Sequence, residues 1–260
     1  MSFMNKGGVR LYYEIEGRED APLLVLSNSL GTDLGMWAPQ MPALLQRFRV
    51  LRHDARGHGQ SDIPPGPYSV EQLGGDVLAL MDHLKIERAH FCGLSMGGMI
   101  GMWLGTHHAG RLNRLVLCNT AAKIGTPDTW NSRIAKVEAE GMASVVDIVL
   151  ERWFTPGFRQ RAPEQVGVVR EMLLRTAPAG YNASCAAVRD MDQRTDIASI
   201  GVPTLVIAGT HDGSTPAADG KAVADAIPGA SYVELDAAHL SNWEQSGRFT
   251  EALCDFLNAG

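Results

Sequence analysis

The chain has 260 residues, of which 45% are apolar, and a formal net charge of −6. This length allows one large domain or two small ones, and the apolar content is sufficient for a substantial buried core. The acidic balance and the absence of a Lys/Arg run argue against nucleic acid or an anionic membrane surface as a partner, but say little about a small-molecule substrate.

The N-terminus and the cysteines indicate the cellular compartment. The first residues contain no apolar signal-peptide core, and no later segment is apolar without interruption over a membrane-spanning length. The cysteines are Cys92, Cys118, Cys185 and Cys254; they lie in apolar contexts without a C-x-x-C pair, which is typical of reduced core thiols. We expect a soluble cytoplasmic protein without a disulfide or a zinc site. Its oligomeric state does not follow from the sequence.

Strand and helix patterns alternate along the chain. Residues 8–17 alternate in polarity, which predicts an exposed antiparallel edge hairpin or strand pair. Short apolar runs then predict strands that are buried on both faces. These runs occupy residues 22–27, 48–51, 89–94, 112–118, 202–208 and 232–235, and helical patterns occupy 70–84, 96–107, 216–226 and 242–257. The alternation predicts an α/β fold with a mostly parallel, eight-stranded sheet between helices.

One segment interrupts this alternation. Residues 119–200 have helical periodicity but no strand pattern. We expect residues 122–190 to form a helical lid over the C-terminal edge of the sheet, where ligands bind in such folds. Residues 1–121 and 191–260 would then form one core.

A glycine-flanked serine lies between a predicted strand and a predicted helix. In Gly93-Leu94-Ser95-Met96-Gly97 the glycines occupy positions where side chains would collide with the strand and the helix around a tight turn. Although G-x-S-x-G also occurs by chance in loops, this context predicts that Ser95 is a nucleophile. The Met96 N–H would then point to the position where an oxyanion develops, at the positive end of the helix.

The loop that follows the predicted strand 22–27 offers a second oxyanion donor. We expect the backbone N–H of Leu30, one residue after Asn28-Ser29, to face that of Met96. The alternative is a plain turn.

Two loops after later strands supply the remaining members of a triad. Asp212 and His239 each follow a predicted strand, in the chain order Ser, Asp, His. The histidine would take the serine proton, and the aspartate would fix the imidazole tautomer and stabilise its cation. Asp212 could instead cap a helix. His211 and Asp236 are competing candidates, which we rank lower because strand alternation and loop position favour the other pair.

These motifs resemble those of the α/β-hydrolase superfamily over nearly the whole chain. The resemblance rests on Asp-Ala-Arg-Gly-His-Gly-Gln-Ser at 54–61 and on the serine motif at 93–98. More narrowly, the stretches 26–33, 124–130 and 238–242 resemble the 3-oxoadipate enol-lactonases.

Three departures from the usual superfamily pattern bear on this resemblance. Most of the superfamily has His-Gly where this chain has Asn28-Ser29, and that replacement is itself typical of the enol-lactonases. Ala238 stands where a glycine usually precedes the catalytic histidine, and Ser246 where a proline is frequent. We expect these two departures to change loop stiffness and not the triad.

The resemblance implies hydrolysis of a five-membered enol-lactone with an acetate side chain, giving 3-oxoadipate in the β-ketoadipate pathway of aromatic catabolism. Ser95 would attack the ring carbonyl, His239 would transfer protons, and the Leu30 and Met96 amides would bind the oxyanion. No metal or organic cofactor is needed. The same triad also serves general carboxylesterases and cofactor-free perhydrolases, and a few members of the fold act as small-molecule receptors.

The anionic substrate implied by this resemblance needs a cationic or strongly donating partner for its carboxylate. Trp130 and Arg133 are three residues apart on the helix predicted over 127–140, so they share one face. We expect Trp130 to pack on the lactone ring and Arg133 to pair with the carboxylate. Arg133 could instead be a solvated arginine that pairs with Glu138 or another acid, and Trp130 could be a core anchor of the lid.

Further substrate contacts are expected around this helix. Ser29 and Trp153 are the additional candidates for binding the lactone. Arg152, next to Trp153, is the alternative partner of the carboxylate.

Overall fold

The computed structural model describes residues 2–258, which form an eight-stranded sheet in the order β1-β2-β4-β3-β5-β6-β7-β8. β1 pairs with β2 and β2 with β4 in antiparallel fashion, and the remaining neighbours are parallel. The strands are β1 (Ser2–Lys6), β2 (Val9–Glu16), β3 (Leu23–Ser27), β4 (Arg49–His53), β5 (Ala89–Leu94), β6 (Leu112–Cys118), β7 (Thr204–Gly209) and β8 (Ser231–Leu235). The predicted α/β fold with a mostly parallel sheet is confirmed.

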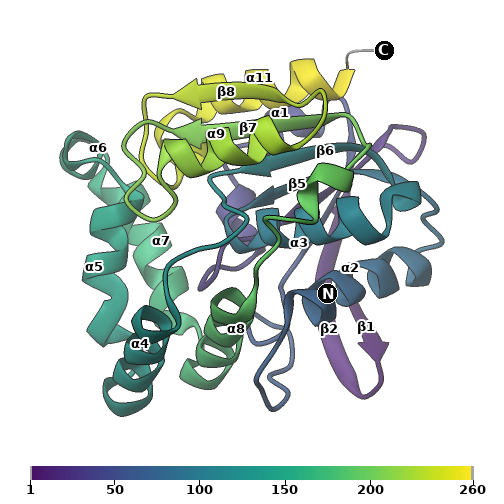
Figure 1. Cartoon of the computed structure of the whole chain (residues 1–260). Helices are drawn as coiled ribbons and strands as arrows, with labels where there is room; N and C mark the ends of the chain where they lie inside the picture. The colour runs from purple at the N-terminus through teal and green to yellow at the C-terminus, as the bar shows by residue number, and fades with distance from the viewer. Residues whose placement is uncertain (1, 259–260) are drawn as a thin grey trace.

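Helices cover both faces of this sheet. In Figure 1, α2, α3 and α9 lie on the near face, and α1 and α11 lie behind it. The helices of these layers are α1 (Met41–Leu44), α2 (Val70–His83), α3 (Met96–His107), α9 (Ala217–Ala226), α10 (Ser241–Glu244) and α11 (Ser246–Asn258), with short 3-10 turns η1 (Leu34–Trp37), η2 (Ala109–Arg111) and η3 (Ile197–Ser199). Among residues 2–258, no helix is long and apolar enough to cross a bilayer.

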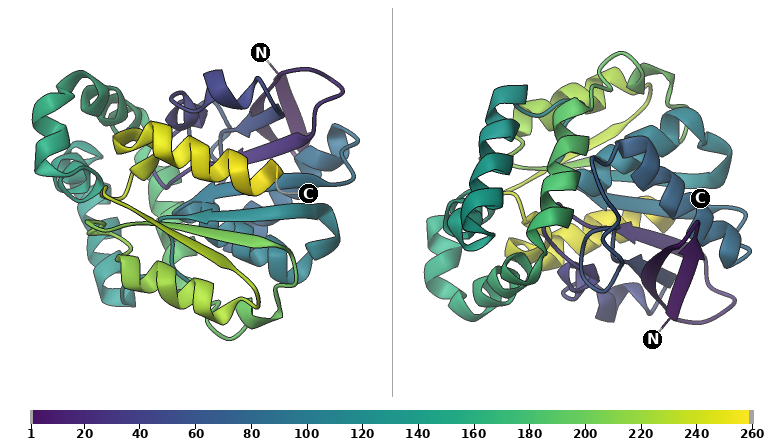
Figure 2. Two further views of the ribbon diagram at one scale, coloured as in Figure 1. Left: turned by 90° about the horizontal axis from the view of Figure 1, so that it is seen from above. Right: turned by 90° about the horizontal axis from the view of Figure 1, so that it is seen from below.

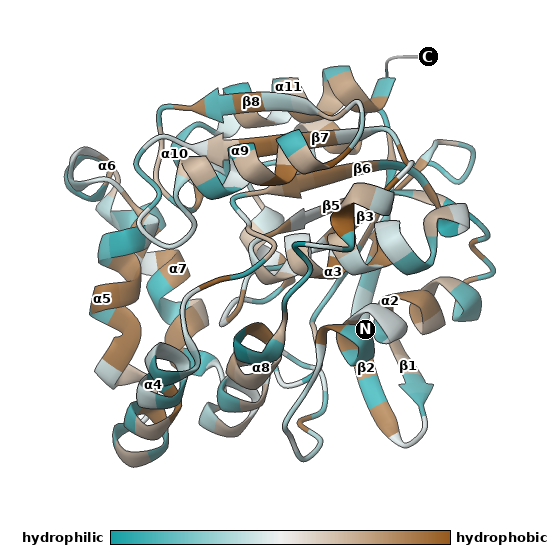
Figure 3. Cartoon of the chain, viewed as in Figure 1, coloured by the Kyte–Doolittle hydropathy of each residue, from teal (hydrophilic) through white to brown (hydrophobic). Residues whose placement is uncertain are grey.

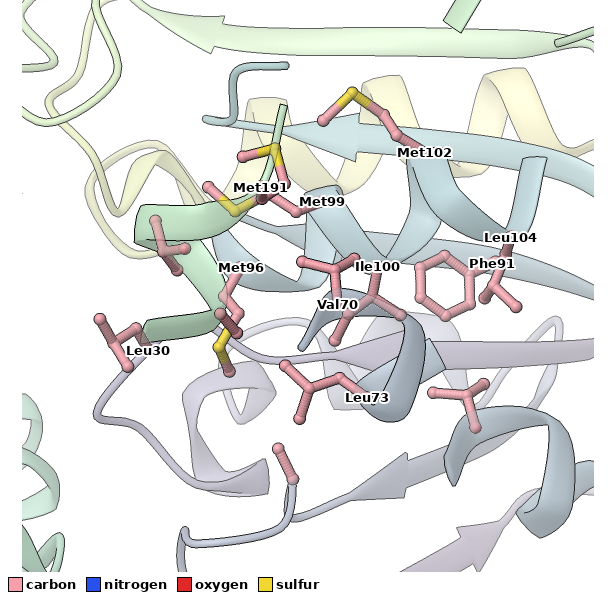
Figure 4. Close-up of a cluster of buried hydrophobic side chains, with 14 of the residues drawn as sticks. Leu30, Val70, Leu73, Phe91, Met96, Met99, Ile100, Met102, Leu104 and Met191 are labelled. Atoms are coloured by element: carbon pink, nitrogen blue, oxygen red, sulfur yellow. The ribbon is translucent and has the colours of Figure 1, made fainter. Parts of the chain in front are cut away.

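The buried core follows the alternation of side chains along the central strands. Phe91 of β5 belongs to a cluster with side chains of α2, α3 and α9, whereas Leu94 belongs to a cluster with α1 and α11. Hydropathy colouring shows the apolar strands between these layers (Figure 3). Leu30 and Met96 belong to the first cluster (Figure 4). The central strands β5 and β7 are therefore buried on both faces, whereas the edge strands β1 and β8 carry exposed residues.

Five helices separate β6 from β7. They are α4 (Pro127–Glu140), α5 (Ala143–Trp153), α6 (Pro156–Arg161), α7 (Pro163–Arg175) and α8 (Pro178–Asp190). Each has proline at its start or within its first turn except α5, and α4 is capped by the Thr126 hydroxyl, which accepts the Thr129 N–H. Both views in Figure 2 place these helices together at one end of the sheet. We call them the helical insertion.

Two sequence predictions differ from the structure. The edge hairpin begins at Ser2 and not at residue 8, because its turn lies at Gly7-Gly8, where both backbones have positive φ. The single helix predicted over 242–257 is wrong: α10 ends before Gln245, whose φ of −122° and ψ of 43° separate it from α11. The Asn242 and Trp243 side chains donate to the Met36 carbonyl, and these tertiary contacts fix the short α10 apart from α11.

Candidate active site

Ser95 occupies a strained turn between β5 and α3. Its φ of 57° and ψ of −113° lie outside the regions that non-glycine residues favour. A Cβ at Gly93 would lie 2.0 Å from the Gly97 carbonyl oxygen, and one at Gly97 would lie 2.2 Å from the Ser27 carbonyl oxygen. Only glycine fits these two positions, which explains the spacing around the serine. The turn projects Ser95 from the C-terminal end of a central strand.

Asp212 and His239 form a buried pair at the same end of the sheet. His239 Nδ1 lies 2.8 Å from Asp212 Oδ2, and both side chains are at most 2% exposed. The other carboxylate oxygen accepts the N–H groups of Ser214 and Thr215 at 2.8 and 2.9 Å. An ionised carboxylate can only accept hydrogen bonds, so Nδ1 of a neutral His239 must be the protonated nitrogen. Nε2 is then free to accept a proton.

The charge of this pair is stabilised from several sides. Burial disfavours the Asp212 carboxylate, but the His239 ring and the hydrogen bonds from Thr215 and Asn119 outweigh burial and hold the pKa of Asp212 below its ordinary value. The carboxylate therefore stays ionised at neutral pH. It can orient the imidazole and stabilise its cation.

Asn119, which the sequence analysis did not identify, joins the two loops of this pair. Its Nδ2 donates to Asp212 Oδ2 at 3.0 Å and to the Ala238 carbonyl at 3.3 Å, while its Oδ1 accepts the Ser241 hydroxyl at 2.6 Å. Its φ is 44°, a conformation that asparagine tolerates better than most residues. The available signal was its position: it directly follows β6, at the edge where the other site residues follow their strands.

The two competing candidates pair with each other and not with the site. His211 Nε2 lies 2.8 Å from Asp236 Oδ1, with the side chains 57% and 76% exposed. An exposed pair of this kind is worth little and lacks the dry surroundings of Asp212 and His239.

One pocket brings most of the predicted residues together. It is lined by Ser95 and His239 and by all four predicted substrate contacts, namely Ser29, Trp130, Arg133 and Trp153. The Trp153 ring centroid lies 5.7 Å from that of His239. No hydrogen bond joins the Ser95 hydroxyl to the His239 ring within residues 2–258; such bonds often tighten only when substrate is bound.

The two predicted oxyanion donors are free to bind a ligand. The residues on either side of Leu30 use their N–H groups internally: Ser29 donates to Met36 Sδ, and Gly31 donates to His58 Nε2. In the described part of the chain, neither the Leu30 N–H nor the Met96 N–H has a protein acceptor. Leu30 also lines the pocket.

Arg133 enters the pocket from α4, which spans the predicted range 127–140. Its guanidinium carbon lies 5.1 Å from the centre of the Trp130 ring, and the Trp130 indole N–H donates to the Ile124 carbonyl. Within residues 2–258 Arg133 makes no salt bridge, so the alternative pair with Glu138 is absent. Arg152 lines the same pocket, where its side chain packs near Gly213.

Comparisons with known proteins identify the relatives of this chain. Residues 22–146 match the family model described as alpha/beta hydrolase fold. Two proteins of Acinetobacter baylyi named 3-oxoadipate enol-lactonase are each 42% identical to it; one alignment covers 94% of this chain and 92% of the relative, the other 98% and 96%. The crystal structure of the enol-lactonase from Burkholderia xenovorans LB400 superposes with a TM-score of 0.97 at 51% identity, over 98% of this chain and 99% of that one. The chain therefore belongs to the α/β-hydrolase family, in the branch that contains the 3-oxoadipate enol-lactonases.

Proposed function

We propose that this protein hydrolyses 3-oxoadipate enol-lactone to 3-oxoadipate through a serine acyl-enzyme, within aromatic catabolism. The names of its relatives support this substrate. The observation that supports it most directly is chemical: Ser95, His239 and Arg133, a cation without an acidic partner in residues 2–258, line one pocket. Such a pocket suits an ester that also has a carboxylate.

The proposed first half-reaction opens the lactone ring. Ser95 Oγ attacks the ring carbonyl carbon while His239 Nε2 takes its proton, and Asp212 stabilises the resulting imidazolium. The N–H groups of Leu30 and Met96 bind the oxyanion of the tetrahedral intermediate. Collapse breaks the ring C–O bond, and the leaving oxygen stays attached to the acyl chain as an enolate. The enolate is a better leaving group than an alkoxide because its charge is delocalised. Protonation by His239 and tautomerisation then convert it to a ketone.

The second half-reaction releases the acid. His239 takes a proton from water as the water oxygen attacks the acyl-enzyme carbonyl, and the same two amides bind the second oxyanion. Collapse transfers the proton from His239 to Ser95 Oγ and leaves a new carboxylic acid, which loses its remaining proton to solvent. The product is a dicarboxylate, whereas the substrate has one carboxylate.

Substrate binding is assigned to residues of the helical insertion and of the Leu30 loop. Arg133 would pair with the substrate carboxylate, Trp130 would pack on the lactone ring, and Trp153 would cover the ring beside His239. Ser29, whose buried hydroxyl has no partner in the described residues, would contact the substrate. In this proposal residues 122–190 act as the lid, and residues 1–121 and 191–260 form the catalytic core.

The proposed location is the cytoplasm. All four cysteines are free and buried, which fits a reducing compartment. The proposed ligand is a small anionic lactone.

A substrate panel tests this function. Purified protein is assayed with the enol-lactone, with neutral lactones and with simple esters, and kcat/KM is compared. We expect the anionic enol-lactone to be preferred over the neutral compounds. Comparable rates across the panel would identify a general esterase, and binding without turnover would identify a receptor; either result would contradict the proposal.

A further inference from the structure

The Leu30 loop is fixed at three successive peptide groups. In the first, which contains the Leu30 N–H, the Ser29 carbonyl accepts the Thr32 hydroxyl at 2.8 Å. In the second, the Gly31 N–H donates to His58 Nε2 at 2.9 Å. In the third, the Gly31 carbonyl accepts the Thr176 hydroxyl at 2.9 Å. The two peptide groups that directly follow the Leu30 N–H are therefore held by residues outside the loop.

His58 provides the anchor from the sheet side. It belongs to the stretch 54–61, for which the sequence analysis gave no role, and it is 1% exposed. Because Gly31 donates to Nε2, the proton of the neutral ring must be on Nδ1, which lies 3.2 Å from the Arg56 carbonyl oxygen. Burial lowers the pKa of His58 to about 4, so the ring stays a neutral acceptor at neutral pH.

Thr176 provides the anchor from the helical insertion. It directly follows α7 and is 4% exposed, and its hydroxyl lies 2.9 Å from the Gly31 carbonyl and 3.0 Å from the Met172 carbonyl. The insertion also packs against the glycine itself. A Cβ at Gly31, whose φ is 82°, would lie 2.8 Å from Leu173 Cδ2 and 3.2 Å from Tyr181 Cε2. This part of the insertion contacts the loop directly in addition to lining the pocket.

We propose that His58 and Thr176 are positioning residues that hold the Leu30 N–H toward the oxyanion, so that the helical insertion contributes to transition-state stabilisation. The inference rests on the proposed function only in that Leu30 binds the oxyanion. A preorganised N–H donor requires no reorganisation free energy when charge develops on the oxyanion. A donor that must first reorient loses this advantage.

A Leu30 N–H that is held less firmly should lower kcat by less than the removal of an oxyanion donor does. Removal of one oxyanion donor lowers kcat by a factor on the order of 100 to 1,000. Thr176→Val keeps the shape of the side chain and removes its hydroxyl, so we expect kcat to fall by about tenfold with little change in KM. Thr176→Ser restores the hydroxyl and should recover most of the rate. His58→Phe removes the ring acceptor and should lower kcat at least as much.

Thr204→Val is the matched control. Thr204 is 2% exposed, its hydroxyl donates to the Val202 carbonyl at 2.7 Å, and it lies at the start of β7, away from the C-terminal edge of the sheet. The control variant should lose thermal stability comparably, because it also removes a buried hydrogen bond. Its kcat should equal that of the wild type.

The test measures turnover of a neutral activated ester and inhibition by a boronic acid, which forms a tetrahedral adduct on a nucleophilic serine. We expect Thr176→Val and His58→Phe to weaken boronate inhibition by the same factor as they lower kcat/KM. If both stay within about twofold of the wild type in kcat and boronate inhibition, or if Thr204→Val loses as much activity, the inference is overturned. Because neither probe depends on the lactone, the result is decisive even if the natural substrate is a different ester.

Discussion

Replacement of Arg133 by Met tests the proposed recognition of the substrate carboxylate. Methionine keeps most of the side-chain bulk beside Trp130 and removes the charge. A hydrogen bond to a charged group is worth about 1.5–3 kcal/mol. Arg133 lines the pocket and makes no salt bridge in residues 2–258, so no protein carboxylate has to be displaced before it binds an anion.

A bond of this strength predicts that kcat/KM for the anionic lactone falls by about ten- to a hundredfold, which corresponds to about 1.4–2.8 kcal/mol. The loss should appear in KM, because the carboxylate is distant from the bond that breaks and interacts equally in the ground and transition states. Hydrolysis of a neutral activated ester should hardly change. Initial rates with both substrates over a range of concentrations provide the comparison.

Arg161→Met is a matched control for Arg133→Met. The Arg161 guanidinium lies 5.0 Å from the Phe158 ring, a cation–π contact in the same helical insertion, and Arg161 does not line the pocket. This variant should keep the selectivity of the wild type. Equal losses on both substrates in Arg133→Met would mean that the residue stabilises the insertion and binds no carboxylate. A selective loss in Arg152→Met instead would place the carboxylate at the other arginine.

Two further predictions concern the acid of the triad and the buried histidine. Asp212→Asn should lower kcat on the order of ten-thousandfold with little change in KM, whereas Asp236→Asn should be nearly silent. The reverse pattern in steady-state kinetics would show that the acid of the triad is assigned to the wrong residue. Because burial lowers the pKa of His58 from 6.5 to about 4, the native state binds fewer protons than the unfolded state and loses stability as pH falls through this range. In urea unfolding, the wild type should lose up to about 3 kcal/mol more stability than His58→Phe between pH 7 and pH 4; identical pH dependence in both proteins would refute the assignment.

The sequence predicted those features that depend on local pattern. Continuous apolar runs identified the buried strands, because a strand covered on both faces requires apolar side chains on both. The glycines around Ser95 indicated the turn, since no other residue fits 2.0–2.2 Å from a carbonyl oxygen. Asp212 and His239 follow their strands at the same edge as Ser95, which allowed both to be proposed from chain order and loop position.

Features that depend on tertiary contacts could not be predicted in this way. Asn119 has one local signal, its position after β6, but its three partners are 93 to 122 residues away along the chain. The end of α10 at Glu244 depends on side chains that bond to Met36. The link from Thr176 to Gly31 spans 145 residues and has no sequence pattern. Pairings of this length become visible only in the folded chain.

The central claim is that Ser95 opens an anionic enol-lactone, and identification of the product tests it most directly. Wild-type protein and Ser95→Ala are incubated with the enol-lactone derived from muconolactone, and the products are identified by mass spectrometry and NMR. We predict stoichiometric 3-oxoadipate from the wild type and a rate lower on the order of a thousandfold or more in Ser95→Ala, with the fold retained. Turnover by Ser95→Ala within about tenfold of the wild type, or recovery of the intact lactone from the wild type, would contradict the account.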